Sequence, residues 1–150
     1  MKLTTKSRYA VRCCLGLAIF GDEDLISVRS ASRHLKLSTK YIENIFLSLK
    51  KHHFIESVRG IKGGYRLAKK PEDIDVYSII VAMENSHTVA PYHKRPDLLA
   101  RVLRRDLWYR IDQELQEYLT NITIADIIEM NGGMEEIKKL DWYKEFKEFT

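Results

Sequence analysis

The chain has 150 residues, of which 45% are hydrophobic and 31% are charged, and this balance is typical of a folded globular protein rather than a disordered one. No apolar run approaches the roughly 20 residues that cross a membrane, and the amino-terminal residues lack the apolar core of a secretory signal. The two cysteines are adjacent, which gives no disulfide framework. We therefore expect a cytoplasmic protein of one domain with a helical extension.

The net charge of +4 is unevenly spread along the chain. Residues 1–75 carry 15 Lys and Arg against 8 Asp and Glu, whereas residues 76–150 carry 10 against 13, so the two halves hold +7 and −3. A clustered excess of positive charge favours an anionic partner such as nucleic acid. The amino-terminal half is therefore the expected binding region.

Residues 1–70 carry the pattern of three short helices followed by a β-hairpin. Apolar residues recur every three or four positions over residues 5–20, 28–35 and 39–53. Ser27 and Ser38 stand where the N-caps of the second and third helices belong. Short strands are expected at residues 54–58 and 65–68, around a glycine-rich loop. This order predicts a mainly α fold with a small β-wing, that is, a winged helix-turn-helix domain.

The third helix and the hairpin tip carry side chains suited to double-stranded DNA. A helix fits the major groove, and its first turn offers free N–H groups to phosphate. The candidate contacts on this helix are Ser38, Thr39, Lys40, Tyr41, Glu43 and Asn44. On the hairpin, we expect Arg59 to enter a narrow minor groove and Lys62 to hold a phosphate. The alternative is that Tyr41 caps the core and that Glu43 and Asn44 are ordinary solvent-facing residues.

Four stretches carry a family resemblance: MKLTTKSRYAV, LSTKYIENIFLSLKK, SVRGIKGGYRLAK and NITIADII. In this order and spacing they resemble the IscR-like family of bacterial winged-helix transcriptional regulators, over about residues 1–130. The resemblance implies a homodimer on a partly palindromic operator, and we expect a repressor. It implies DNA contacts at Lys40, Tyr41 and Glu43 of the helix, and at Arg59 and Gly60 of the wing. The Ile61-Lys62 pair departs from wings that are richer in glycine and proline.

The carboxyl-terminal half predicts helices for assembly. Asp75 caps a helix over residues 76–84, a polar loop covers 85–96, and a long helix runs over about 97–119. Thr123 caps a short helix over residues 124–130. Apolar residues step by four along the long helix, at Leu99, Leu103, Leu107, Ile111 and Leu115. Because so broad a face is hard to cover with a small wing domain, we expect this helix to pair with a second copy. The alternative is a helix that packs wholly within its own subunit.

The last residues predict one amphipathic helix with Ile137, Leu140, Tyr143 and Phe146 on a single stripe. We expect this tail to dock on the dimer body, with a partner-protein surface as the alternative. The chain thus divides into a DNA-binding domain (1–70), a linker helix and sensor loop (71–96), dimerisation helices (97–130) and a tail (131–150).

Many relatives in the family hold an iron–sulfur cluster on three cysteines before the long helix, but residues 85–96 contain no cysteine. Clusters are held chiefly by thiolates, so we expect no metal and no cofactor. The candidate sensor residues are His87, Tyr92, His93 and Cys14. The basic residues of the loop favour an anionic small molecule as the effector. The alternative is that a partner protein carries the signal. The simpler interpretation of Cys14 is that it packs in the core.

Two other functions stay open on the same fold: a general RNA-binding module and a protein-interaction adaptor. Competition between single-stranded RNA and duplex DNA separates the first from a DNA-binding regulator. The sequence has no nucleophile paired with a base at usable spacing, no phosphate-binding loop and no metal-binding cluster. We therefore expect no enzyme activity.

Overall fold

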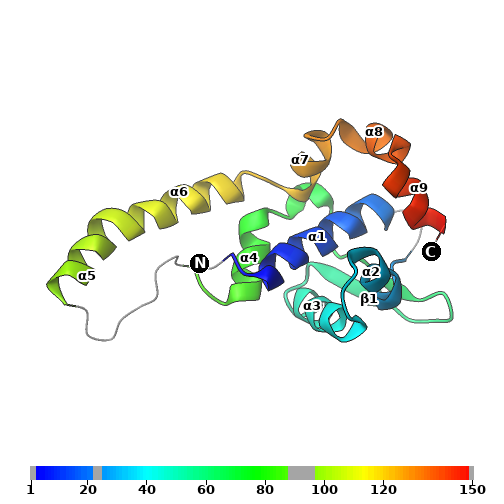
Figure 1. The fold of residues 1–150 in the computed structure, drawn as a ribbon, viewed down its shortest axis with the longest axis horizontal. Coiled ribbons are helices and arrows are strands. Elements are labelled where there is room, and N and C mark those ends of the chain that lie inside the picture. Colours follow the sequence, from blue (N-terminus) through cyan, green and yellow to red (C-terminus); the bar gives the residue numbers. More distant parts are fainter. Residues whose placement is uncertain (1–2, 22–24, 88–96, 149–150) are drawn as a thin grey trace.

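The computed structural model describes residues 3–21, 25–87 and 97–148, and it is mostly helical with one two-stranded antiparallel sheet (Figure 1). Three helices come first, α1 (Thr5–Phe20), α2 (Val28–Leu35) and α3 (Thr39–Lys51). The strands β1 (Ile55–Val58) and β2 (Gly64–Leu67) follow, and Ile55 pairs with Leu67 at the base of the hairpin. The predicted winged helix-turn-helix is therefore confirmed.

The predicted N-caps are also confirmed. The side chains of Ser27, Ser38, Asp75 and Thr123 each accept a hydrogen bond from the backbone N–H three residues further on. Such caps satisfy backbone donors that the first helical turn leaves without partners. Helix α3 ends at Lys51, two residues before the predicted end, because His53 takes a positive φ of 59°.

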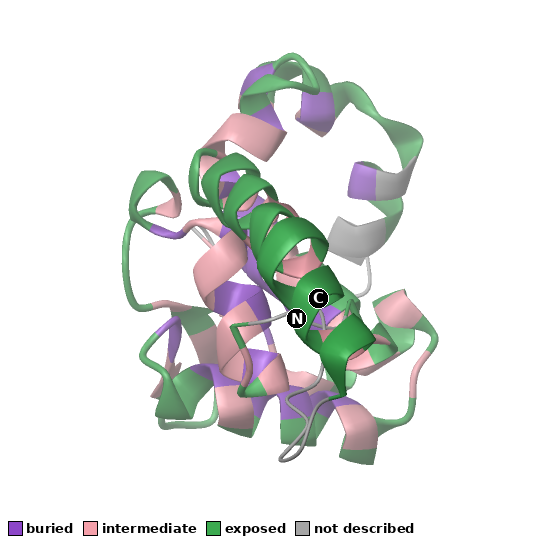
Figure 2. Ribbon diagram, turned by 90° about the vertical axis from the view of Figure 1, so that its left-hand side faces the viewer, coloured by how far each residue is buried: buried purple, intermediate pink, exposed green. Residues whose placement is uncertain are grey.

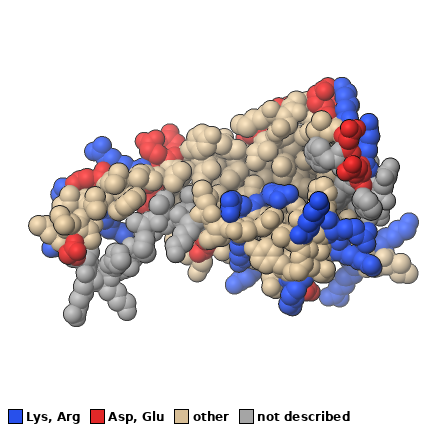
Figure 3. Space-filling view, in the orientation of Figure 1, with Lys and Arg blue, Asp and Glu red and all other residues tan. Residues whose placement is uncertain are grey.

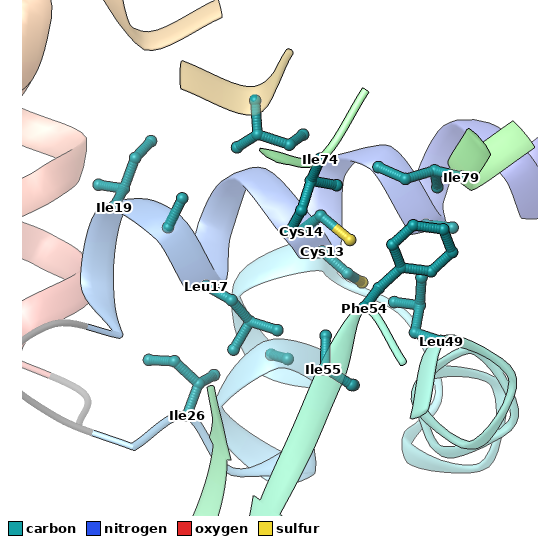
Figure 4. Close-up of a cluster of buried hydrophobic side chains, with 14 of the residues drawn as sticks. Cys13, Cys14, Leu17, Ile19, Ile26, Leu49, Phe54, Ile55, Ile74 and Ile79 are labelled. Atoms are coloured by element: carbon teal, nitrogen blue, oxygen red, sulfur yellow. The ribbon is translucent and has the colours of Figure 1, made fainter. Parts of the chain in front are cut away.

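Helix α1 lies at the centre of the core. It contacts α3 and β2 on one side and α4 (Val76–Glu84) and α7 (Ile124–Glu129) on the other. Figure 4 shows Cys13, Cys14 and Leu17 among side chains from several of these elements. Because α1 is covered on more than one side, it buries more than the single predicted stripe, and both adjacent cysteines are inside. The core also includes side chains from every predicted division of the chain, so those divisions are not separate folding units.

The predicted long helix is a helical arm over residues 98–120. It consists of α5 (Leu98–Leu103), a π-helical stretch η2 (Arg104–Trp108) and α6 (Tyr109–Thr120). Helix α6 packs on α4, where Leu115 and Leu119 lie against Val76 and Ile80, and Ile111 and Asp112 of α6 are half-buried. Helix α5 and most of η2 project away from the body and are mostly exposed (Figures 1 and 2). No helix in the described part of the chain is long and apolar enough to cross a membrane.

The tail differs from the prediction of one helix. Leu140 has an extended backbone (φ −70°, ψ 140°) that splits it into α8 (Gly133–Lys139) and α9 (Asp141–Glu148). This break lets Ile137 and Tyr143 turn inward, and the Tyr143 ring stacks on Phe20 of α1 at 5.0 Å between centroids. The tail thus docks on its own chain, at the end of α1.

Replacing Ile137 with alanine tests this docking. The side chain is 3% exposed, so we expect the free energy of unfolding to fall by about 2–5 kcal/mol. Leu140→Ala is the matched control, because Leu140 is 44% exposed and its truncation is expected to cost about 1 kcal/mol or less. Urea unfolding followed by circular dichroism measures both. Equal losses for the two variants would contradict a docked tail.

Candidate nucleic-acid interface

A tight turn between α2 and α3 leaves the start of α3 in solvent. Lys36 takes the left-handed conformation (φ 54°, ψ 42°), and the N–H of Leu37 donates to the carbonyl of Ser32 at 3.1 Å. The Ser32 hydroxyl donates back to the Leu37 carbonyl at 2.6 Å. The Ser38 hydroxyl oxygen accepts from the N–H of Tyr41 at 3.2 Å and so caps α3. The turn therefore fixes the direction of α3 and presents its positive N-terminal end.

The outer face of α3 carries four of the predicted contacts, since Thr39, Lys40, Glu43 and Asn44 are all exposed. Lys40 Nζ lies 3.6 Å from Glu43 Oε2, and an ion pair this exposed contributes little free energy. Both groups are therefore available to exchange this pairing for a phosphate or a base edge. Leu47, which the sequence analysis missed, is 53% exposed one turn further along and is suited to contact a thymine methyl group.

Tyr41 is placed differently from its neighbours. Its side chain is half-buried against the core, and its ring meets the Tyr9 ring edge-on at 6.1 Å between centroids. The guanidinium carbon of Arg12 lies 5.3 Å from the centroid of that Tyr9 ring. The packing agrees with the alternative that Tyr41 caps the core, so its contact with DNA stays a prediction.

The wing tip is a tight loop that requires glycine at two positions. Gly60 has a φ of 134°, and its carbonyl accepts from the N–H of Gly63 at 2.9 Å. A Cβ on Gly63 would lie 2.5 Å from the Val58 carbonyl oxygen, so no larger residue fits without a shift. Arg59 and Lys62 are exposed at this tip, where the prediction places them. Ile61 between them is fully exposed, and an apolar side chain here suits insertion into a groove.

The base of the wing is fixed to α3. Ile26 and Tyr65 exchange backbone hydrogen bonds of 3.0 and 2.9 Å, which adds a short third segment beside β2. The Tyr65 ring packs edge-on against Phe46 of α3, with 4.8 Å between centroids. The wing and the outer face of α3 are therefore held as one unit.

Positive charge gathers over this unit. Figure 3 shows Lys and Arg side chains over α2, α3 and the wing, whereas the acidic side chains visible on this face lie mainly along the helical arm and the tail. Six of these cations are exposed and make neither an ion pair nor a side-chain hydrogen bond with another described residue, whereas Lys50 donates a hydrogen bond to the Ser57 hydroxyl. They are Arg29, Arg33, Lys36, Lys51, Arg59 and Lys62. Unpaired cations on one face are what phosphate binding requires, and those of α2 were not among the predicted contacts.

The candidate sensor residues are not brought together. Cys14 is fully buried, and burial together with the neighbouring Cys13 raises the pKa of its thiol. Reactive cysteines are exposed and have lowered pKa values, so the structure counts against Cys14 as a redox sensor. His87 is exposed, and its Nδ1 lies 3.3 Å from the Tyr77 hydroxyl. Tyr92 and His93 lie outside the described residues.

The thiols give a measurable prediction. Burial raises the pKa of the Cys13 thiol from 9.0 to about 12, so a thiol reagent at pH 8 is expected to label neither cysteine before the protein unfolds. In the unfolded chain the thiol ionises near pH 9. The stabilisation from the protonated Cys13 is therefore complete below pH 9, and it falls by about 1.4 kcal/mol per unit as the pH rises toward 12. Rapid stoichiometric labelling at pH 8 without denaturant would contradict this.

Comparison with known proteins agrees with this geometry. The model of the Rrf2 family, described as an iron-dependent transcriptional regulator, matches residues 3–130. The chain belongs to the Rrf2 family. It is 33% identical over 137 residues to the transcriptional regulator IscR of Vibrio atlanticus, covering 90% of this chain and 79% of that protein. It is also 33% identical over 131 residues to the protein rrf2 of Nitratidesulfovibrio vulgaris, covering 85% and 87%.

Solved structures of Rrf2-type regulators share the fold. CymR of B. subtilis, the global cysteine regulator, superposes with a TM-score of 0.72 at 28% identity and covers 85% of this chain and 95% of its own. IscR of T. potens superposes with a TM-score of 0.68 at 30% identity and covers 86% and 87%. The predicted resemblance is thus confirmed, and the protein is a DNA-binding transcriptional regulator of this family.

The family description names iron, but the donor groups of this chain do not fit a thiolate-held cluster. Metal-binding thiols must be deprotonated, whereas Cys13 and Cys14 lie in the core of α1 with raised pKa values. The described residues also contain no group of three or more His, Cys, Asp or Glu side chains placed to hold a metal ion. The two thiols of this chain are therefore not placed to hold an iron–sulfur cluster.

Proposed function

We propose that this Rrf2 regulator is a homodimeric repressor that places α3 in the major groove and the wing in the minor groove of a partly palindromic operator. The main support for the proposal is that the exposed face of α3 and the wing tip belong to one unit held together by packing and backbone hydrogen bonds. Unpaired cations lie on this same unit. In this arrangement Lys40, Arg59 and Lys62 supply phosphate and groove contacts. Glu43 and Asn44 read base edges.

The helical arm supports the dimer. Its free half exposes several large apolar side chains on a monomer, namely Leu98, Leu99, Val102, Leu103, Leu107 and Tyr109. An apolar surface of this extent in water favours a partner, and a second copy supplies an identical one. A two-fold protein matches a two-fold operator, and each half-site then receives one α3 and one wing.

A competition experiment tests the nucleic-acid class. Labelled duplex DNA carrying a site selected by the protein is titrated with unlabelled duplex of the same sequence, with scrambled duplex and with single-stranded RNA. We expect only the cognate duplex to compete at equal concentration. Equal competition by RNA would replace the proposal with a general nucleic-acid module. No binding to any of the three would support an adaptor.

Glu43→Ala is expected to relax sequence choice more than it weakens binding. A carboxylate that accepts from a cytosine amino group contributes about 1–3 kcal/mol of discrimination at one base pair, while its removal leaves the phosphate contacts in place. Binding to a library of single-base variants of the selected site measures this discrimination. Glu72→Ala, which removes an exposed carboxylate from η1 (Pro71–Asp73), is the control. An unchanged base preference in Glu43→Ala would show that another residue reads the site.

A further inference from the structure

Ile61 stands alone at the tip of the wing. It is 108% exposed, which makes it the most exposed large apolar side chain among the described residues. The arm of the same chain does not cover it, because α5 and the wing lie at opposite ends of the molecule (Figure 1). A single exposed apolar residue is common on protein surfaces, so its exposure alone assigns no role. The role follows from the way the loop holds this side chain and from the charges around it.

The loop holds Ile61 in a fixed position. Gly60 and Gly63 close a four-residue turn, in which the N–H of Gly63 donates to the Gly60 carbonyl at 2.9 Å. Ile61 and Lys62 are the two central residues of this turn, so they form its outer end. The β-branched side chain of isoleucine is itself restricted in χ1. Little conformational freedom is therefore left for this side chain to lose when it meets a partner.

The charges beside Ile61 favour a polyanion. Arg59 and Lys62 are exposed, and neither makes an ion pair or a side-chain hydrogen bond with another described residue. The one acidic residue between positions 55 and 67 is Glu56, and its Oε1 lies 2.6 Å from Nε of Arg66 across the two strands. No unpaired carboxylate of the hairpin therefore repels phosphate. An apolar side chain between two cations matches the minor groove, where phosphates line both edges and the base stack lies between them.

Resting on the proposed function, we propose that Ile61 is a wedge that inserts between two base pairs from the minor groove, partly unstacks them and bends the operator. Lys62 then holds a phosphate beside the opened step, and Arg59 lies in the groove next to it. Apolar wedges of this kind kink duplex DNA by roughly 20–90° toward the major groove.

The wedge also selects sequence. The free energy of unstacking depends on the base-pair step, and pyrimidine–purine steps such as TA and CA open most easily. Ile61 therefore favours such a step in each half-site without a hydrogen bond to either base.

Unstacking is measured with 2-aminopurine, whose fluorescence rises when it leaves the base stack. It replaces each adenine of the selected duplex in turn, and the full-length protein is added to saturation. With the wild type we expect a rise at one pyrimidine–adenine step in each half-site. Ile61→Leu keeps an apolar wedge and is expected to retain the rise, whereas Ile61→Ala is expected to lose it. Lys62→Ala is the matched control from the same turn, expected to bind more weakly but to retain the rise at saturation.

The selected step has a separate readout. Replacing it with the stiff step AA is expected to raise the Kd of the wild type about tenfold, and that of Ile61→Ala by less than about twofold. Gel mobility of circularly permuted fragments measures the bend, which is expected to be smaller with Ile61→Ala. Circular dichroism checks that each variant stays folded, as the full exposure of Ile61 predicts.

The outcomes separate the wedge from the proposed function. Specific binding by the wild type without a rise at any adenine would overturn the wedge and leave the proposed function standing. An equal rise with Ile61→Ala, or an equal loss of affinity by both proteins for the duplex with AA, would also overturn the wedge alone. Binding to no duplex would overturn the proposed function and the wedge with it.

Discussion

Arg59→Ala is expected to weaken binding to a selected duplex by about 1–3 kcal/mol, which is roughly 5- to 150-fold. Arg59 is exposed at the wing tip, and no described residue forms an ion pair with it, so its charge is available to DNA. A narrow minor groove concentrates negative potential and attracts an inserted arginine. The loss should also reduce the dependence of log K on log salt by about one unit, because one cationic contact disappears.

Fluorescence anisotropy at several salt concentrations measures both effects. Arg101→Ala is the matched control, since Arg101 is an exposed arginine on α5, far from α3 and the wing in Figure 1. We expect its Kd to stay within about twofold of the wild type and its salt slope to stay unchanged. If the two arginine variants bind alike, the wing does not enter a groove.

Leu103→Asp is expected to split the dimer and to weaken operator binding by about 10²- to 10⁴-fold. Leu103 is 46% exposed on the helical arm, so the substitution leaves the core of a single subunit intact. A carboxylate on an apolar interface must lose its hydration without a partner, which is costly. A monomer then binds one half-site at a time. It loses the gain in affinity that a dimer obtains because binding of its first subunit raises the effective concentration of the second at the other half-site.

Sedimentation velocity measures the assembly, and circular dichroism verifies the fold. The control is Arg101→Glu, which introduces a carboxylate on the opposite side of α5, because two residues along a helix turn the side chain by about 200°. We expect the control to remain a dimer. A dimeric Leu103→Asp would place the dimer contact elsewhere on the molecule.

Local signals in the sequence were sufficient for much of the fold. The serine and threonine caps at Ser27, Ser38 and Thr123 act within one helical turn, so their roles are visible in the sequence alone. The glycines of the wing likewise report local backbone geometry. Apolar periodicity and turn residues supplied the order of the elements, and the family resemblance made the class of function specific, which the comparisons confirm.

Features that depend on tertiary contacts were harder to predict. The half-burial of Tyr41 depends on its contact with Tyr9, which lies 32 positions earlier in the chain. The periodicity of apolar residues does not predict a contact between two positions so far apart. The tail was predicted as one helix because its stripe is regular, yet packing of Tyr143 on Phe20 accompanies a break at Leu140. Leu47 was missed, and Ile61 was noted only as a departure from the usual wing, because exposed apolar residues are common and only their place beside the proposed contacts gives them a role.

The most direct test of the account is selection of binding sites from a random duplex library by the purified full-length protein, followed by sequencing. We expect one enriched, partly palindromic motif with two half-sites, because the protein is proposed to bind as a two-fold dimer. The centres of the half-sites should be about 10–10.5 base pairs, or a multiple of that, apart, since two copies of α3 must reach the same side of the duplex. Enrichment of no sequence, or of a motif without two-fold symmetry, would contradict a dimeric regulator that reads DNA through α3 and the wing.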